Sequence, residues 1–486
     1  MGAGGANVWV RDGQYTAATL VINAGVHLYG GFDAAFDLAG RDVSLVGTVI
    51  NGVASQRAFD VVGSSPTVIV DGLRLDGGSV ATFGLSVDET EIELRSVQVD
   101  SFANHGIRLI NNTLLDEIDV QISNCAFTRN GADGLSLNGG FDLRVDGSSF
   151  DTNAQEGMDL DDLVALEGQK ATLQVIGCRF FGNGAEGLDA DLSAPLGGGA
   201  GGGSFEIEIR GCSFERNGFA GLLIDEEYEN VPGWSADIVV RECQFRANRT
   251  AGVHIDADGL GSILLERVLA NGNRGDGIWI SSETDAGVVV ISASVASGNL
   301  GAGMRATFGN RSIVASHCIL AGNLGGGLIS EVVESTATSC ISYLQSNPWQ
   351  GTRLSSTVDV TDPLAGAFQV APEEYAYIVA QAQATLTLDV PVSFAPGVPV
   401  ELSDDGTELV AMQVMDVGTT VVLDAAPDDF AVPGLLSSFA PAAGVDEDYT
   451  LPLGSPAEGQ GLTPPGGADR RRRRMGLAER RPARIW

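Results

Sequence analysis

Short runs of alternating hydrophobic and polar residues recur along the first 350 residues of the chain. In Met158-Asp-Leu160 and in Phe205-Glu-Ile207-Glu-Ile209, every second side chain is apolar. This alternation is the period of a β-strand that buries one face. The runs are short and are separated by Gly and Asn, so the pattern predicts many short strands and few helices.

The runs belong to a sequence motif that repeats when the chain is aligned with itself. One copy reads Cys125-Ala-Phe127-Thr-Arg-Asn130-Gly-Ala-Asp-Gly134, and the same residue types return at similar spacing in the following copies. The glycines that mark the copies are residues 84, 106, 134, 157, 187, 221, 252, 277, 303 and 327. Their spacing averages about 27 residues, which is the length of one turn of a solenoid.

Each copy contains enough residues for three short strands, which is the composition of one coil of a parallel β-helix. The repeated Asn tolerates the left-handed turn conformation and can pass side-chain hydrogen bonds to the Asn of the next coil. The repeated Gly would stand where a Cβ atom would clash. The repeated Phe would stack inside as one aromatic column, formed by Phe127, Phe150, Phe180, Phe214 and Phe245.

These repeats resemble those of the right-handed parallel β-helix proteins of the pectate-lyase-like superfamily, which include secreted and surface proteins of bacteria. Residues 7–31 resemble their opening coils, and residues 454–457 with 469–476 resemble a degraded copy of a closing motif. The resemblance implies an all-β fold and an extracellular or cell-surface location. It implies no single activity, because the same coil carries lyases, hydrolases, epimerases and inert stalks.

Four regions are predicted from the extent of the repeat. Residues 7–350 form the right-handed parallel β-helix solenoid, and residues 351–375 are a linker or last coil. Residues 376–435 alternate over longer runs and predict a small antiparallel β unit. Residues 436–486 are an irregular tail containing Arg470 to Arg474. This basic run is either a solvated tail that lies on the acidic body or a recognition or processing signal.

Composition narrows the classes of partner. The chain has 486 residues, a formal charge of −35, 44% hydrophobic residues and 65 glycines, which indicates a folded protein that repels nucleic acid and anionic membranes. No apolar run approaches the length of a membrane-spanning helix, and Met1 to Ala6 lack the features of a signal peptide. We expect a monomer with no nucleic-acid partner and no membrane span.

Five cysteines occupy the same place in their coils, two residues before the Phe or its substitute. They are Cys125, Cys178, Cys212, Cys243 and Cys318. We expect reduced thiols that point inward, although a disulfide between adjacent coils is sterically conceivable. Zinc is not expected, because no CxxC motif is present and the chain has only four histidines.

Two columns of outward side chains carry the candidate chemistry. Counting from the marker Gly, the fourth residue is Asp161, Asp191, Asp225 and Asp256 on four successive coils. Stacked carboxylates repel one another, so we expect calcium, which takes oxygen ligands in flexible geometry, to bind there. The alternative is that these acids only keep the surface soluble. The longer coils also contain insertions at residues 163–170, 193–203 and 226–235, which would wall a groove.

The second residue after the marker Gly is Asp159, Asp189, Leu223, His254, Trp279 or Arg305 on successive coils. An acidic groove with an exposed Trp suits a polysaccharide or cell-surface glycan, and we expect Asp159, Asp189, His254, Trp279 and Arg305 to bind it. The alternative is a calcium-dependent lyase or glycoside hydrolase, with Asp191, Asp225, His254 and Arg305 as catalytic candidates. A purely structural stalk is the third possibility, so whether the chain is an enzyme stays open.

Overall fold

The computed structural model describes most of residues 6–360 and, beyond them, only six strands between residues 374 and 438. The longer undescribed stretches before residue 360 include 194–202 and 227–233. The predicted groove walls at 193–203 and 226–235 therefore lie largely outside the described residues, as does all of the Arg-rich tail after residue 438. The described residues contain no helix.

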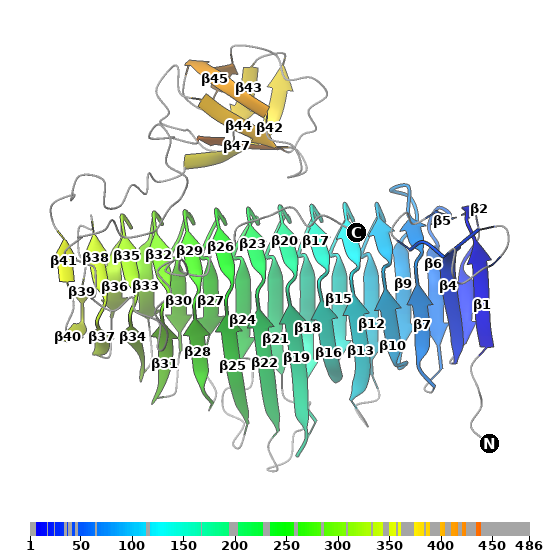
Figure 1. Ribbon diagram of the computed structural model, residues 1–486, viewed down its shortest axis with the longest axis horizontal. Coiled ribbons are helices and arrows are strands. Elements are labelled where there is room, and N and C mark those ends of the chain that lie inside the picture. The colour runs from blue at the N-terminus through cyan, green and yellow to red at the C-terminus, as the bar shows by residue number, and fades with distance from the viewer. Residues whose placement is uncertain are drawn as a thin grey trace.

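Residues 6–360 form three parallel β-sheets in which each strand pairs with the strand three positions later in the chain, so one coil contributes one strand to each sheet (Figure 1). The strands of sheet A are β1 (Ala6–Arg11), β4 (Val26–Phe32), β7 (Val68–Asp71), β10 (Ile92–Arg95), β13 (Ile118–Ser123), β16 (Phe141–Asp146), β19 (Lys170–Ile176), β22 (Ser204–Arg210), β25 (Ser235–Arg241), β28 (Ile263–Glu266), β31 (Ala286–Ser292), β34 (Asn310–Ser316), β37 (Ser335–Thr338) and β40 (Thr352–Ser355).

The strands of sheet B are β2 (Gly13–Thr16), β5 (Thr48–Asn51), β8 (Arg74–Asp76), β11 (Gln98–Asp100), β14 (Ala126–Thr128), β17 (Ser149–Asp151), β20 (Arg179–Phe181), β23 (Ser213–Glu215), β26 (Gln244–Arg246), β29 (Leu269–Asn271), β32 (Val295–Ser297), β35 (Ile319–Ala321), β38 (Ile341–Tyr343) and β41 (Val358–Val360). The strands of sheet C are β3 (Leu20–Asn23), β6 (Arg57–Val62), β9 (Phe83–Asp88), β12 (Ile107–Asn111), β15 (Leu135–Gly139), β18 (Met158–Val164), β21 (Leu188–Ser193), β24 (Leu222–Glu226), β27 (Val253–Asp256), β30 (Ile278–Ser281), β33 (Ala302–Thr307), β36 (Gly326–Ser330) and β39 (Trp349–Gln350). The predicted parallel β-helix is confirmed.

The core contains the predicted aromatic column. The rings of Phe127, Phe150, Phe180, Phe214 and Phe245 stack in sequence, with centroids 4.6–5.0 Å apart and interplanar angles of 13° or less. Each of these side chains is fully buried. Because equivalent residues of successive coils face each other, one repeated residue type forms a continuous core.

The repeated Asn residues form a second internal column, the Asn ladder, consisting of Asn130, Asn153, Asn183, Asn217, Asn248, Asn273, Asn299 and Asn323. In each step the Nδ2 atom of one Asn donates to the Oδ1 atom of the next, at 2.8–3.0 Å. The predicted coil-to-coil hydrogen bonding is therefore confirmed. The ladder satisfies polar groups that would otherwise be buried without partners.

These Asn residues do not use the left-handed conformation that their residue type tolerates. The left-handed residue is the one before the Asn, as at Arg129 (φ 54°), Thr152 (φ 57°) and Arg216 (φ 61°). The Asn residues themselves are absent from the positive-φ set. Their side chains bridge coils, and this contact rather than backbone conformation accounts for their position in the repeat.

The marker glycines are required by a close contact between coils. A Cβ atom added at Gly157 would lie 2.5 Å from the carbonyl oxygen of Gly187 and 2.8 Å from Nδ2 of Asn183. The backbone of Gly157 does not have a positive φ. The clash that the sequence predicts is therefore present, and its cause is the carbonyl and Asn of the next coil.

All six cysteines are free and buried, as expected of core thiols. The five predicted positions include Cys178 and Cys212, which are neighbours on adjacent coils: the backbone N–H of Cys178 lies 3.4 Å from Sγ of Cys212. Cys340 occupies the equivalent place one coil after Cys318 and is a sixth member of this file, beyond the five predicted from the repeat. Burial raises the pKa of the Cys125 thiol to about 12, so this thiol is inert.

Beyond the solenoid, six strands pair antiparallel in a closed barrel. They are β42 (Glu374–Ala382), β43 (Thr385–Leu388), β44 (Pro399–Ser403), β45 (Val410–Asp416), β46 (Thr420–Leu423) and β47 (Gly434–Ser438). The antiparallel pairing agrees with the long alternating runs in this part of the sequence. The proposed domain boundaries remain predictions. A search of the described residues finds no helix with the length and hydropathy needed to cross a membrane.

Candidate functional site

The outward face of sheet C brings together the side chains at the second place after the marker Gly. Register pairs connect Asp159 to Asp189, Leu223, His254, Trp279 and Arg305 in that order, one residue per coil. We call these six residues the outer ladder. Their inward neighbours, such as Met158 and Leu160, are fully buried, so the strand alternation places the ladder on the outer surface.

The fourth-place aspartates stack in part as expected. Asp191, Asp225 and Asp256 are direct register partners on β21, β24 and β27. Asp161 is not in the same simple register, because β18 carries a bulge between Leu160 and Leu163. A bulge adds a residue to one strand and redirects side chains.

Asp162 adjoins Asp161 in this bulge and has a left-handed backbone (φ 56°). Its carboxylate accepts hydrogen bonds from Nδ2 of Asn138 at 3.2 Å and from Oγ of Ser193 at 3.1 Å. Two adjacent acids therefore stand where the repeat predicts one. The fourth-place aspartates therefore do not form one continuous column, because its first member, Asp161, lies in the bulge.

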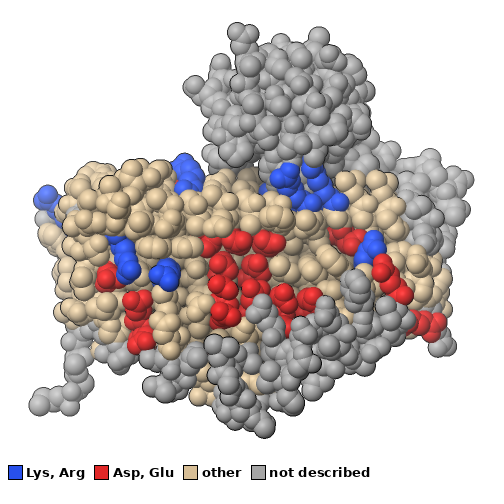
Figure 2. Space-filling view, turned by 180° about the vertical axis from the view of Figure 1, so that it is seen from behind, with Lys and Arg blue, Asp and Glu red and all other residues tan. Residues whose placement is uncertain are grey.

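Three further acidic residues, not predicted from the repeat, contribute to this face. They stand immediately before the marker Gly: Asp133, Glu156 and Glu186. Carboxylate oxygens of Asp133, Glu156 and Asp159 lie within 4.8 Å of one another, and so do those of Glu156, Glu186 and Asp189. We call these five residues the acidic cluster. Figure 2 shows Asp and Glu side chains gathered in the middle of one face of the solenoid.

Three acids of the cluster, Glu156, Asp159 and Asp189, have raised pKa values. Burial, together with the negative charges of Asp133, Asp161 and Asp191, raises the pKa of Asp159 to about 7. Burial and the charges of Asp191, Glu186, Asp159 and Asp225 raise the pKa of Asp189 to about 8. Burial and a hydrogen bond shared with Asp133 raise the pKa of Glu156 to about 9. Carboxyl groups with such pKa values exchange protons near neutral pH.

The hydrogen bonds of the cluster are unevenly distributed. His105 contacts Asp133 through Nδ1 and Oδ2, 2.6 Å apart, so the most buried acid of the cluster has a partner. At Asp189, the Oδ1 atom is buried and has no hydrogen-bond partner in the described structure. An oxygen in this situation would gain from a proton or a cation.

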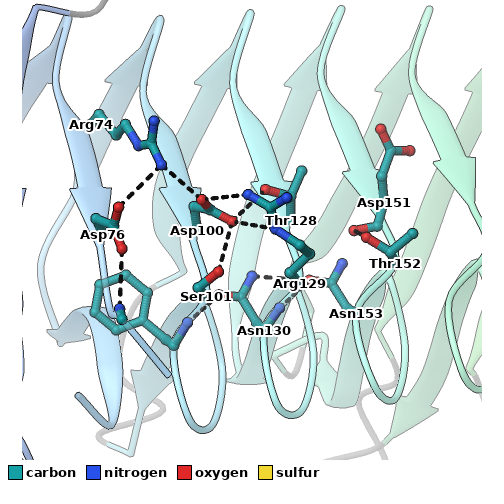
Figure 3. A network of polar contacts seen from close by, with 12 residues as sticks. Arg74, Asp76, Asp100, Ser101, Thr128, Arg129, Asn130, Asp151, Thr152 and Asn153 are labelled. Atoms are coloured by element: carbon teal, nitrogen blue, oxygen red, sulfur yellow. Dashed lines mark hydrogen bonds and ion pairs between the residues drawn. The ribbon is translucent and has the colours of Figure 1, made fainter. Parts of the chain in front are cut away.

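Acids on sheet B provide a contrast, because arginines neutralise them (Figure 3). Arg74 bonds both Asp76 and Asp100, at 3.1 and 3.0 Å, and Arg129 reaches Asp100 at 2.8 Å. Burial alone would raise the pKa of Asp100, but the hydrogen bond and charge of Arg129 hold it below its usual value. The raised pKa values on sheet C therefore follow from burial among like charges.

The second half of the outer ladder is aromatic and then cationic. The rings of His254 and Trp279 stack with centroids 3.9 Å apart and an interplanar angle of 5°. Nε2 of His254 lies 2.9 Å from Oγ of Ser281, and the indole N–H of Trp279 donates to Oγ1 of Thr307 at 2.7 Å. Burial lowers the pKa of His254 to about 4, so this ring is neutral at physiological pH.

Arg305 ends the outer ladder in an ion-pair network. Its Nε atom lies 2.7 Å from Oδ2 of Asp276, and its Nη1 atom lies 2.9 Å from Oε1 of Glu331. Burial would lower the pKa of Arg305, but these two acids raise it above its usual value. The guanidinium is therefore a fixed positive charge and is poorly suited to act as a base.

The acidic cluster has the composition of a site for a hard cation. Ca²⁺ takes carboxylate oxygens in flexible geometry, and the cluster offers two groups of three carboxylates that share Glu156, each with oxygens within 4.8 Å of one another. Among the described residues, the fourth-place aspartates do not form such a group of three or more. The metal assignment of Asp161, Asp191, Asp225 and Asp256 stays a prediction.

Comparisons with known proteins agree with the fold. The family model described as "Right handed beta helix region" matches residues 79–231 and 164–338. No curated protein matches the chain. Among solved structures, the A-module of the mannuronan C-5 epimerase AlgE6 from Azotobacter vinelandii is 16% identical, with a TM-score of 0.46, and the match covers 74% of this chain and 92% of that chain.

Two further solved structures have the same kind of likeness. The tailspike protein gp49 of the Acinetobacter baumannii bacteriophage Fri1, a capsular polysaccharide depolymerase, is 12% identical with a TM-score of 0.36, and the match covers 89% of this chain and 79% of that chain. A GH87 alpha-1,3-glucanase catalytic domain is 11% identical with a TM-score of 0.36, over 72% and 63% of the two chains. These likenesses concern the fold. Because the family model spans more than half of the sequence and the structure has three parallel sheets, the chain belongs to the right-handed β-helix family.

Proposed function

We propose that the chain binds an extended carbohydrate along the outer face of sheet C. The observation that carries the proposal is the outer ladder, in which side chains from six successive coils form one continuous row. With coils about 4.8 Å apart, the row is roughly 24 Å long. A binding site of this shape fits a linear chain better than a compact ligand.

The chemistry of the ladder fits the same class of ligand. The rings of His254 and Trp279 cover each other's inner faces, and the edges of this stack form an apolar surface against which C–H groups of a sugar ring can pack. Asp159 and Asp189 on one side can bind hydroxyl groups, and Arg305 on the other side can bind hydroxyl or carboxylate groups. For a protein with this function, we propose an extracellular or cell-surface location.

Replacing Trp279 with Ala should weaken retention of the chain on an insoluble glycan about tenfold or more, because the main apolar surface of the ladder is lost. The measurement is a pull-down from a panel of insoluble polysaccharides with wild type and variant. A matched control is Trp9→Ala, which removes an exposed Trp from β1, outside the ladder. Equal retention of wild type and Trp279→Ala on every glycan bound would contradict the proposal.

Calcium is proposed as the ion that offsets the repulsion among the acids beside the ladder. Wild type should melt at a higher temperature with millimolar calcium than with a chelator, because an ion at 100 times its Kd stabilises a fold by about 2.7 kcal/mol. Asp189→Asn should reduce the shift, whereas Asp76→Asn on sheet B should leave it unchanged. If wild type melts at the same temperature with calcium and with chelator, calcium does not bind the acidic cluster.

A hydrolase or lyase is the second candidate, and the raised pKa of Asp189 is the observation that favours it. A protonated carboxyl beside ionised ones is the arrangement of a general acid and a base. Asp191 and Asp225, on adjacent coils, are the candidates for the base or nucleophile. Release of shorter glycans by wild type but not by Asp191→Asn or Asp225→Asn would favour catalysis over binding alone.

A further inference from the structure

Five arginines near the middle of the described solenoid lie along one turn and the adjoining strands of sheet B. Arg179 and Arg246 belong to β20 and β26, and Arg216, Arg249 and Arg274 follow β23, β26 and β29. We call these five residues the arginine edge. Figure 2 shows Arg side chains gathered above the acidic area of the same face.

The register brings the arginines of this edge close together. Glu215, which precedes Arg216, lies beside Arg246 of the next coil in the register of β23 and β26. The backbone N–H of Arg249 donates to the carbonyl of Asn217 at 3.0 Å, and that of Arg274 donates to the carbonyl of Asn248 at 2.9 Å. Arg249 and Arg274 are therefore equivalent residues of successive coils. Side chains at this spacing present their charges to the same partner.

Packing holds part of the edge in place and leaves an apolar side chain beside it. The guanidinium of Arg179 lies 4.5 Å from the centre of the Phe181 ring and pairs with Asp151 at 3.1 Å. The guanidinium of Arg216 lies 5.7 Å from the same ring. Phe219, in the turn after Arg216, is 51% exposed. An exposed aromatic side chain next to several arginines is the composition of a protein-binding surface.

The sequence contains an acidic partner of matching character. Residues 361–469 hold 17 Asp and Glu side chains and no Lys, Arg or His. This acidic segment includes the strands of the barrel, β42 to β47. The chain as a whole has a charge of −35, so a cluster of five arginines is a local exception on its surface. Opposite charges on two parts of one chain attract at high effective concentration.

We propose that the arginine edge binds the acidic segment, residues 361–469, of the same chain. The contact is electrostatic, with Phe219 as an apolar contact, and it fixes the C-terminal part against the solenoid. It leaves the outer ladder as a separate surface. The proposal is independent of the carbohydrate-binding function.

The test is small-angle X-ray scattering on the full chain. Wild type in 50 mM salt should be compact, and its radius of gyration should increase in 1 M salt, where charges more than about 3 Å apart are screened. The triple variant Arg216→Glu, Arg249→Glu, Arg274→Glu should already be extended in 50 mM salt and should lose the salt dependence. Unchanged circular dichroism would show that the solenoid of the variant is folded.

A control variant carries the same change of charge on sheet A and in the turn that follows it. Arg144→Glu, Arg210→Glu, Arg267→Glu should behave like wild type. Equal radii of gyration for wild type and the edge variant in 50 mM salt would overturn the proposal. A doubled scattering mass that the edge variant abolishes would assign the contact to a second copy of the chain. If the edge variant loses retention on polygalacturonate while its radius of gyration stays that of wild type, the edge binds an external polyanion. Either result also overturns the proposal.

Discussion

Replacing Asp189 with Asn should make the chain more resistant to urea than wild type at pH 8.5 and should leave resistance at pH 4 unchanged. The folded-state pKa of Asp189 is raised to about 8, whereas an unfolded Asp titrates near 4. The stability associated with its protonated form is fully present below about pH 4 and is lost as the pH rises through about 8. Asn resembles the protonated carboxyl and cannot ionise, so the variant avoids this loss.

The gain at pH 8.5 should be at least about 1.4 kcal/mol, the free energy of one pKa unit. Urea unfolding of both proteins at the two pH values measures it. Asp100→Asn is the matched control of opposite sign, because Arg129 lowers the pKa of Asp100 and the ionised form stabilises the fold. Asp100→Asn should therefore lower the free energy of unfolding, and the decrease should be largest at pH 8.5. Equal pH dependence of Asp189→Asn and wild type would contradict the assignment of a protonated carboxyl at this place.

Replacing Phe180 with Ala should lower the free energy of unfolding by about 3–5 kcal/mol, because it leaves a cavity in the middle of the aromatic column. The ring of Phe180 is fully buried and stacks on Phe150 and Phe214, with centroids 5.0 and 4.6 Å away. Urea unfolding at one pH measures the change.

Phe219→Ala is the control for this prediction, because it makes the same substitution at a ring that is 51% exposed. The control should change the free energy of unfolding by less than about 1 kcal/mol. Similar losses for the two variants would show that neighbouring coils do not depend on the column for their stability.

The sequence predicts the fold well because one coil is repeated many times. Three features recur in every copy and could be read from the sequence: the alternation of apolar and polar residues, the spacing of the marker glycines and the column of Phe residues. The conformation of Asn130 and its equivalents was not readable. A turn of this kind needs both a left-handed residue and a side chain that bridges coils, and Asn suits either task. The structure assigns the left-handed backbone to the preceding residue, such as Arg129.

The candidate site was predicted less completely, for two physical reasons. Alternation determines side-chain direction only inside a strand, so Glu156 and Glu186, which precede the strands β18 and β21, were not assigned to the surface that holds Asp159. A signal was nevertheless present, because the residue before the marker Gly is acidic on three successive coils. The bulge at Asp161 and Asp162 is a local change of register, and the average period of a repeat does not contain it.

The Asn ladder has a direction. The first seven carboxamides donate toward the C-terminal end of the solenoid and all eight accept from the N-terminal side, so eight electrically neutral side chains align their dipoles head to tail. Such chains polarise one another, and each bond strengthens its neighbours. The interior of the solenoid is therefore electrically polar along its axis, like a helix built from side chains instead of peptide groups, and its two ends are not chemically equivalent.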